Sequence, residues 1–362
     1  MHTQRIFGLD LMRAAAIIMV VYAHSYDVLR VVPLPPLPRP AIDGVDLFFV
    51  LSGYLIGGIL LRYATMEAVP WHRRLLDFWQ RRWLRTLPNY YLFLAINVAL
   101  VLAGMNGGVI NHNTWAYALF LQNVWKPLDL FFWESWSLVV EEWFYLLFPL
   151  LLFGAIAIKG SAAKRAFILL AMLFIVGPMA MRLVLAPEVP SLWHMEQGLR
   201  KLVITRLDAI GWGILAAWVQ SSYPKAWSKA PRPLLFLGLA VMLGCAMAYG
   251  ADRLAFSATH YFTLNALGMT MLLPALSAWG KAPRWGRFIT FISLVSYALY
   301  LVHQPVRYVF NRWFALEQEA GLLLPLVLYW AVCIALSWLV WRFWERRFME
   351  MRAGISGRLG VI

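Results

Sequence analysis

The sequence has few charged residues for its length. Asp, Glu, Lys and Arg make up 14% of its 362 residues, whereas about 25% is usual in soluble proteins. Apolar and aromatic residues make up 62%, and an excess of this size has to be solvated by lipid. The composition therefore excludes an ordinary soluble domain and indicates a polytopic membrane protein.

The sequence also lacks the patterns of several ligand-binding classes. Its two cysteines, Cys245 and Cys333, lie in apolar segments, which argues against a cysteine metal site. His24, His303 and carboxylates could ligate zinc, but no local spacing such as H-x-x-x-H occurs, so we predict no metal. The net charge of +14 is not concentrated in a separate basic module, so we expect no nucleic-acid partner.

Ten apolar segments follow one another along the chain. They cover about 7–31, 42–62, 88–105, 136–157, 165–186, 203–220, 233–250, 259–279, 288–311 and 322–345. A helix of about 20 residues spans the hydrocarbon core of a bilayer. The first segment contains charges and no convincing cleavage site, so we interpret it as a permanent helix rather than a signal peptide.

Lysine and arginine are concentrated in alternate loops and in the C-terminal tail. Because positive charge favours the cytoplasmic side, we predict that both termini are cytoplasmic. The predicted fold class is an all-α polytopic membrane protein with about ten transmembrane helices around a polar channel. Residues 1–345 form the transmembrane domain, and 346–362 form a short basic cytoplasmic tail.

The first segment contains two polar side chains that share one face. Arg13 and His24 are eleven residues apart, so at about 100° per residue they point within about 20° of each other and lie roughly 16 Å apart along the axis. Such groups are costly at membrane depth unless they face a cavity or a partner. Their shared face predicts a polar channel along this helix.

Arginines gather at the predicted inner end of the channel, where Arg81, Arg82 and Arg85 precede the third segment. Guanidinium groups bind phosphates in a bidentate manner and stay charged. The alternative is a basic loop that touches anionic lipid headgroups.

At the predicted outer end, His24, Glu141 and Asp46 lie at a similar depth. An imidazole beside a carboxylate is the arrangement of a general base. The alternative is a structural pair that pins two helices together.

A phosphate site at one end and a base at the other suit a long ligand with an anionic head and a reactive tip, such as acyl-coenzyme A. A transporter or flippase of an anionic or lipid-linked substrate is the alternative, although inverted repeats are not evident. A purely structural partner in a polysaccharide-assembly complex is less favoured, because a scaffold need not bury an arginine.

Five sequence blocks in this order resemble the acyltransferase-3 family of integral membrane acyltransferases. They are R-x10-H (Arg13 and His24), G-V-D-L-F-F-V-L-S-G-Y (44–54), R-R-x-x-R (Arg81, Arg82 and Arg85), W-S-L-x-x-E-E-x-F-Y (136–145) and S-Y-x-x-Y-L-x-H-x-P (296–305). This resemblance covers nearly the whole chain, and it implies a membrane acyltransferase domain over 1–345.

The resemblance also implies an activity and site residues. It implies an O-acyltransferase that moves an acyl group, usually acetyl, from cytoplasmic acyl-CoA to a carbohydrate hydroxyl. His24 would be the catalytic base, supported by Glu141 (preferred over Glu142), and the coenzyme would bind Arg13, Arg81, Arg82 and Arg85. Further candidates that support the site are Asp46, Ser52, Asp208, Tyr297 and His303.

Larger members of that family carry an extracytoplasmic esterase-like domain, and no G-D-S block for it occurs here. We therefore expect the membrane domain to acylate its acceptor directly, with relay through a separate partner as the alternative. No permanently bound cofactor is predicted, and acetyl-CoA is the expected donor. The expected location is the bacterial inner membrane, in contact with lipid. The motifs specify neither the acceptor (O-antigen, exopolysaccharide, glycolipid precursor or small glycoside) nor the oligomeric state.

Overall fold

The computed structural model describes residues 5–25, 43–66, 68–129, 131–159, 163–314 and 323–351, and over these ranges it contains helices and no strand. The α-helices are α1 (Phe7–Ser25), α2 (Gly44–Ala64), α3 (Trp71–Leu102), α4 (Trp115–Ala118), α5 (Ser135–Lys159), α6 (Ala163–Leu185), α7 (Leu192–Met195), α8 (Asp208–Ser222), α9 (Pro224–Lys229), α10 (Pro231–Ala248), α11 (Leu254–Ala258), α12 (His260–Ala278), α13 (Gly286–Phe314) and α14 (Leu323–Val340). Short 3₁₀ turns cover Ala186–Glu188, Val203–Thr205 and Ala251–Arg253, and π-helical turns cover Glu196–Arg200 and Trp341–Glu345.

Nine helices in the described part of the chain are long and apolar enough to cross a membrane. The all-α polytopic class is therefore confirmed. The prediction of a full span over 203–220 is wrong, because α8 has only 15 residues. At 1.5 Å per residue it is about 22 Å long, shorter than the hydrocarbon core of about 30 Å. The residues before α8 form short turns instead of extending this helix.

The third helix begins earlier than predicted. α3 starts at Trp71 and passes through Pro88 as one element of 32 residues, whereas hydropathy placed its start at 88. Its first half buries Leu75 and Phe78 against the bundle, so it is an amphipathic part of the helix rather than a basic loop. Arg82 and Arg85 therefore share a helical face three residues apart.

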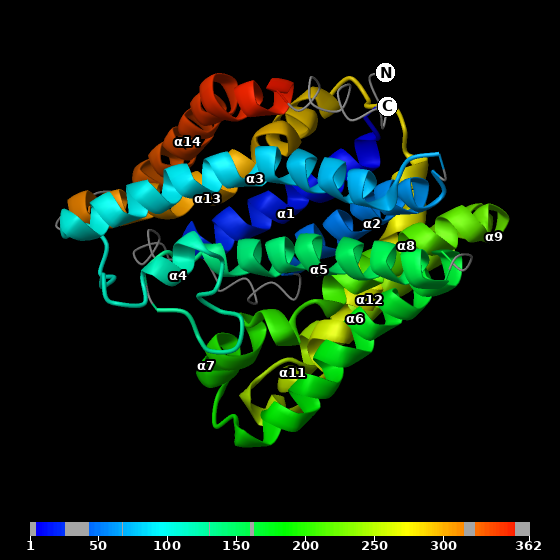
Figure 1. Ribbon diagram of the computed structural model, residues 1–362. Coiled ribbons are helices and arrows are strands. Elements are labelled where there is room, and N and C mark those ends of the chain that lie inside the picture. Colours follow the sequence, from blue (N-terminus) through cyan, green and yellow to red (C-terminus); the bar gives the residue numbers. More distant parts are fainter. Residues whose placement is uncertain are drawn as a thin grey trace.

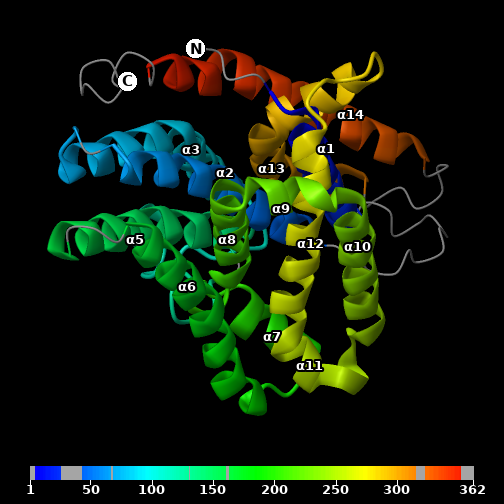
Figure 2. The same cartoon turned by 90° about the vertical axis from the view of Figure 1, so that its right-hand side faces the viewer.

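Figures 1 and 2 show the helices in two sets. In Figure 2, α8, α10 and α12 stand side by side, while α2, α3 and α5 run across them. In Figure 1, α1 begins at the upper right, and the helix that continues α14 ends along the upper edge of the bundle. Residues 26–31 of the first predicted segment and 352–362 of the predicted tail lie outside the described residues.

Glycines bring α2 and α8 into backbone contact. A Cβ on Gly53 would lie 2.1 Å from the Ile210 carbonyl oxygen, and a Cβ on Gly213 would lie 2.1 Å from that of Val50. Only residues without a side chain permit such an approach, which is typical of helix pairs in membranes. This contact holds α2 in place as one wall of the cavity described next.

Candidate active site

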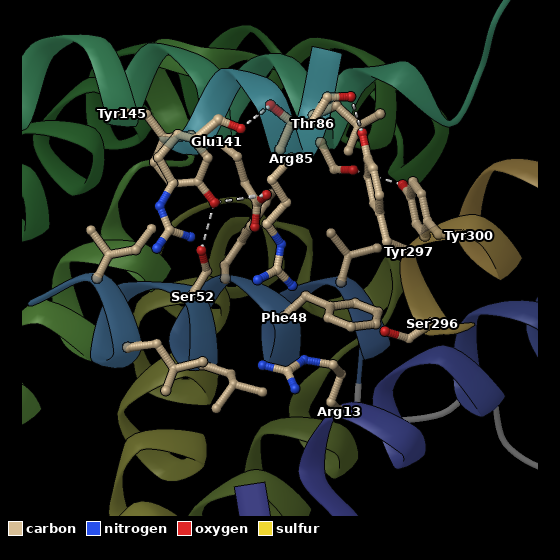
Figure 3. Close-up of a pocket in the computed structure, with 18 residues that line it drawn as sticks. Arg13, Phe48, Ser52, Arg85, Thr86, Glu141, Tyr145, Ser296, Tyr297 and Tyr300 are labelled. Carbon is tan, nitrogen blue, oxygen red and sulfur yellow. Dashed lines mark hydrogen bonds between the residues drawn. The ribbon is translucent and has the colours of Figure 1, made fainter. Parts of the chain in front are cut away.

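One cavity lies where α1, α2, α3, α5 and α13 meet (Figure 3). It has about 830 Å³ of empty space, part of it open to solvent. Its walls combine aliphatic and aromatic side chains with a small polar set: Arg13, Ser52, Arg82, Arg85, Thr86, Ser137, Glu141, Tyr145, Ser296, Tyr297 and Tyr300. The sequence predicted a polar channel along α1, and this cavity lies beside that helix.

Three guanidinium groups converge on the cavity. Figure 3 shows the side chains of Arg13 and Arg85 reaching toward each other from α1 and α3. Arg82 lies over two aromatic rings, with its guanidinium carbon 5.8 Å from the centre of Phe78 and 6.0 Å from that of Tyr145. These stacking contacts help to hold the Arg82 side chain in place.

Glu141 is the one carboxylate among the described residues that line this cavity. It accepts a hydrogen bond of 3.1 Å from the Tyr145 hydroxyl, and that hydroxyl lies 2.8 Å from Ser52 Oγ. Glu142 does not line the cavity and instead accepts a bond of 2.5 Å from Thr86. With three cations and one anion, the lining retains positive charge, which suits an anionic ligand with several oxygens.

Arg13 is positioned by groups that the sequence reasoning missed. Its Nη1 lies 3.3 Å from Ser293 Oγ and 3.5 Å from Asp10 Oδ1, and Asp10 also binds Arg5 at 2.8 Å. The Asp10–Arg13 spacing of three residues places both on one helical face, so this partner was readable from the sequence. Ser293 lies 280 residues away and was not.

Arg81 does not line the cavity. Its Nε lies 2.8 Å from Asp77 Oδ2, one turn earlier in α3. The structure thus brings Arg13, Arg82 and Arg85 together around the cavity and leaves Arg81 in a local ion pair. Tyr297 does line the cavity and donates a bond of 2.8 Å to the Thr86 carbonyl.

His24 has a different partner from the one predicted. Its Nδ1 lies 3.0 Å from Nε2 of His303, and the two rings stack with their centres 5.0 Å apart. His303 is fully buried in α13. Tyr300 connects this pair to the cavity, because it lines the cavity and its ring centre is 5.8 Å from that of His303.

The predicted meeting of His24, Glu141 and Asp46 does not occur in the described structure. His24 lies in the last turn of α1, whereas Glu141 lies six residues into α5, about 9 Å along the helix. Asp46 is fully buried in an ion pair with Arg206. The predicted depth of each side chain in the membrane was counted from the first apolar residue of its segment. This count was too inaccurate to show which side chains meet.

Asp208 also belongs to a buried ion pair. Its Oδ2 lies 2.7 Å from Arg182 Nη2 and accepts a bond of 2.6 Å from Thr263. Arg182 further binds the carbonyls of Thr205 and Thr259. These contacts join α6, α8 and α12, and they leave the Asp208–Arg182 pair outside the cavity lining.

A polar layer covers the ends of these helices near His24. Arg200 donates a bond of 2.9 Å to Asp43, and although burial opposes the charge of Asp43, Arg200 outweighs it and lowers the pKa of that carboxyl. Burial lowers the pKa of Lys201 to about 7, and its amine lies 4.0 Å from the centre of the Trp133 ring. Burial raises the pKa of Glu134 to about 8. Close-packed ionisable groups therefore surround this end of the bundle.

The aromatic residues of the segment between α3 and α5 differ in exposure. Trp115 and Trp125 are exposed, whereas Tyr117 is buried and donates to the Asp129 carbonyl at 2.5 Å.

Within the described residues, no group of three His, Cys, Asp or Glu side chains is placed to hold a metal ion.

The fold and cavity define a multi-pass helical membrane protein with a cationic internal site. A family model described as "Acyltransferase domain" matches residues 6–342. The chain therefore belongs to this family, the acyltransferase-3 family that its motifs indicated.

Curated relatives match shorter parts. The chain is 32% identical over 186 residues to a Bacillus subtilis (strain 168) protein named "Putative peptidoglycan O-acetyltransferase YrhL", which covers 46% of this chain and 26% of the relative. It is 32% identical over 158 residues to the O-acetyltransferase OatA of Staphylococcus aureus (strain NCTC 8325 / PS 47), which covers 40% of this chain and 24% of the relative. The matches thus span about a quarter of each relative's length. No solved structure matches the chain.

Proposed function

We propose that this protein is a membrane O-acyltransferase that moves an acyl group, acetyl by family default, from acyl-CoA to a carbohydrate hydroxyl. The observation that carries the proposal is the cavity lined by Arg13, Arg82 and Arg85, in which Glu141 is the one carboxylate among the described lining residues. Family membership supplies the reaction class, and the cavity supplies a site for a polyanionic donor.

The three arginines bind the phosphate groups of the donor. Like charges that converge in a partly closed space repel one another, and a ligand with several phosphate oxygens removes this repulsion while it accepts bidentate hydrogen bonds. Because Arg81 is paired with Asp77 outside the cavity lining, we assign it no direct contact with the donor. Glu141, which accepts a hydrogen bond from Tyr145, offsets part of this positive charge.

His24 is the catalytic base in this proposal. It takes the proton of the acceptor hydroxyl while the hydroxyl oxygen attacks the thioester carbonyl carbon. The carbon–sulfur bond then breaks, the ester forms, and coenzyme A leaves as a thiolate that takes up a proton. A base in this position contributes about 10²–10⁴ in rate. Tyr300, which connects the cavity to the imidazole pair, marks the place where the thioester meets the acceptor.

The acceptor in this proposal is a cell-envelope glycan or its lipid-linked precursor. The relatives' names support this class, since one is named for peptidoglycan. We further propose that the protein resides in the inner membrane with both termini in the cytoplasm, because its basic loops alternate with less basic ones. Acyl-CoA would then enter from the α1 start, and the acceptor would enter near the end of α1, where His24 lies.

The test is thiol release from acetyl-CoA by the protein in nanodiscs, with and without a host glycan extract. We expect acceptor-dependent release that His24→Ala abolishes and Arg85→Ala reduces. Arg73→Ala is the matched control, because Arg73 is an exposed cation on the same helix as Arg85. A wild-type protein that translocates an anion without releasing thiol would contradict the proposal and favour the transporter alternative.

A further inference from the structure

The hydrogen-bond partners of the two histidines restrict where their protons lie. Nδ1 of His303 lies 3.2 Å from the Leu299 carbonyl oxygen, and Nε2 of His303 lies 3.0 Å from Nδ1 of His24. A carbonyl oxygen only accepts hydrogen bonds, so Nδ1 of His303 carries a proton and donates it. In a neutral imidazole the other nitrogen, Nε2, then carries a lone pair and accepts.

This restriction extends to His24. Since Nε2 of His303 accepts, Nδ1 of His24 must carry the proton between the two rings. Neutral His24 therefore has its lone pair on Nε2, and this atom makes no hydrogen bond to the described residues. The carbonyl of Leu299 thus determines, through two imidazoles, which nitrogen of His24 can act as a base.

We propose that His303 is a positioning residue that holds His24 in the Nδ1-protonated tautomer and so presents Nε2 to the acceptor hydroxyl. The catalytic part of this inference rests on the function proposed above. Which histidine is the base follows from burial: His303 has 0% exposure, whereas His24 is half-buried and so accessible. His303 takes the place that a carboxylate occupies in a catalytic triad, where it orients the imidazole.

Neighbouring groups fix the orientation of His303. Its own backbone carbonyl accepts a hydrogen bond of 3.1 Å from the Tyr329 hydroxyl of α14, and Tyr300 packs on its ring. The charged groups that act on the pair are cationic: Arg307 on α13 acts on both rings, and Arg200 and Lys201 act on His24. Because these cations already act on the two rings, a neutral His303 that accepts the proton of His24 suits this site better than a positively charged one.

Two substitutions separate positioning from packing. The amide of glutamine reaches about as far as Nε2 of histidine, so His303→Gln retains an acceptor for Nδ1–H of His24. The amide of asparagine reaches about as far as Nδ1, so His303→Asn retains the contact with Leu299 and removes the acceptor. Both replace a ring by an amide of similar size, which makes them matched controls for each other.

The first measurement does not depend on activity. The protein is labelled with ¹⁵N in its seven histidines, and the His24 signals are assigned by their loss in His24→Ala. We expect protonated Nδ1 and unprotonated Nε2 in the wild type and in His303→Gln, and a mixture of tautomers in His303→Asn. A wild-type His24 protonated on Nε2, or a tautomer unchanged in His303→Asn, would overturn the inference.

The second measurement is acetyl transfer by the same variants. We expect kcat to fall about 10–100-fold in His303→Asn, the range seen when the hydrogen-bond partner of a metal-bound histidine is removed. KM for acetyl-CoA should stay within about two-fold because the arginines are unchanged. His303→Gln should recover most of kcat. Equal kcat values in the two variants, or a loss confined to KM, would count against positioning. If the wild type shows no transfer at all, the proposed function fails, and the NMR measurement still decides the role of His303.

Discussion

Two groups of arginines in this protein have opposite surroundings. Arg182 and Arg206 are fully buried, and each forms an ion pair with a carboxylate on a neighbouring element, Asp208 or Asp46. Arg82 and Arg85 face a cavity toward Arg13, and the lining offers one carboxylate, Glu141, to all three. Each arginine of the first set has a carboxylate of its own, whereas the cavity lining offers the second set fewer carboxylates than guanidinium groups.

This difference separates structural from functional charge. An arginine at membrane depth needs a partner, and a carboxylate from another helix provides one that ties the two helices together. Where guanidinium groups converge without enough carboxylates, the protein retains a repulsion that an anion relieves. The balance of charge around an arginine, rather than its burial, therefore indicates a binding site. Of the four sets of variants below, the first two test this view.

The largest expected effect is on the structural pair. Asp208→Ala leaves Arg182 buried and uncompensated, so we expect the protein to lose about 3–5 kcal/mol of stability. Thermal unfolding in detergent measures the loss. The control is Arg346→Ala, which breaks an exposed pair with Glu350 and should cost less than about 1 kcal/mol. A melting temperature for Asp208→Ala equal to that of the wild type would remove the distinction between the two groups.

Arg85→Ala should show the opposite pattern. Removal of one of three converging cations relieves repulsion, so we expect a melting temperature equal to or above that of the wild type. Acetyl-CoA loses charge-assisted hydrogen bonds worth about 1.5–3 kcal/mol, which corresponds to roughly a 10–150-fold increase in KM. Steady-state kinetics measures this, and a large loss of stability without a change in KM would assign Arg85 to the structural set.

Gly53→Ala tests the contact that holds the cavity wall. The new Cβ would lie 2.1 Å from the Ile210 carbonyl oxygen, so α2 and α8 must move apart, at a cost of about 1–3 kcal/mol. Gly58→Ala is the matched control on the same helix, since nothing lies within 4 Å of its Cβ position. We expect a lower melting temperature for Gly53→Ala alone; equal values would mean that α2 tolerates the shift.

The smallest effect is expected at Glu134, a buried carboxyl that is neutralised by a proton instead of by an ion pair. Burial raises its pKa to about 8 from an ordinary value of 4.5. Between these pH values the native state binds a proton that the unfolded state has released, so its contribution to stability decreases as pH rises. Glu134→Gln removes this pH-dependent contribution to stability.

We therefore expect the melting temperature of the wild type to fall more than that of Glu134→Gln between pH 5 and pH 6. Over this interval the difference in the free energy of unfolding is about 1 kcal/mol. Glu188→Gln, at an exposed glutamate, serves as the control. If Glu134→Gln were the more pH-sensitive protein, Glu134 would be ionised in the native state.

Many residues of the site could be predicted from the sequence, but which of them lie together in one cavity could not. The blocks contain Arg13, Arg82, Arg85 and Glu141, which the structure brings to one cavity. Sequence reasoning also placed Asp46 and Asp208 near this chemistry because they lie within or beside motif-like stretches, and the structure gives each a buried arginine. Adjacency in a motif does not indicate which way a side chain points.

The sequence by itself determined the class of protein and most of its helices, because hydropathy and helical periodicity are local properties of about 20 residues. It also determined that Arg13 and His24 share a face of α1. Only the tertiary structure decided their partners: the arginines of α3 for Arg13 and His303 for His24, which lies 279 residues away along the chain. The physical reason is that a buried polar group interacts with whatever packing brings within about 3 Å, and packing joins helices that are far apart in the sequence.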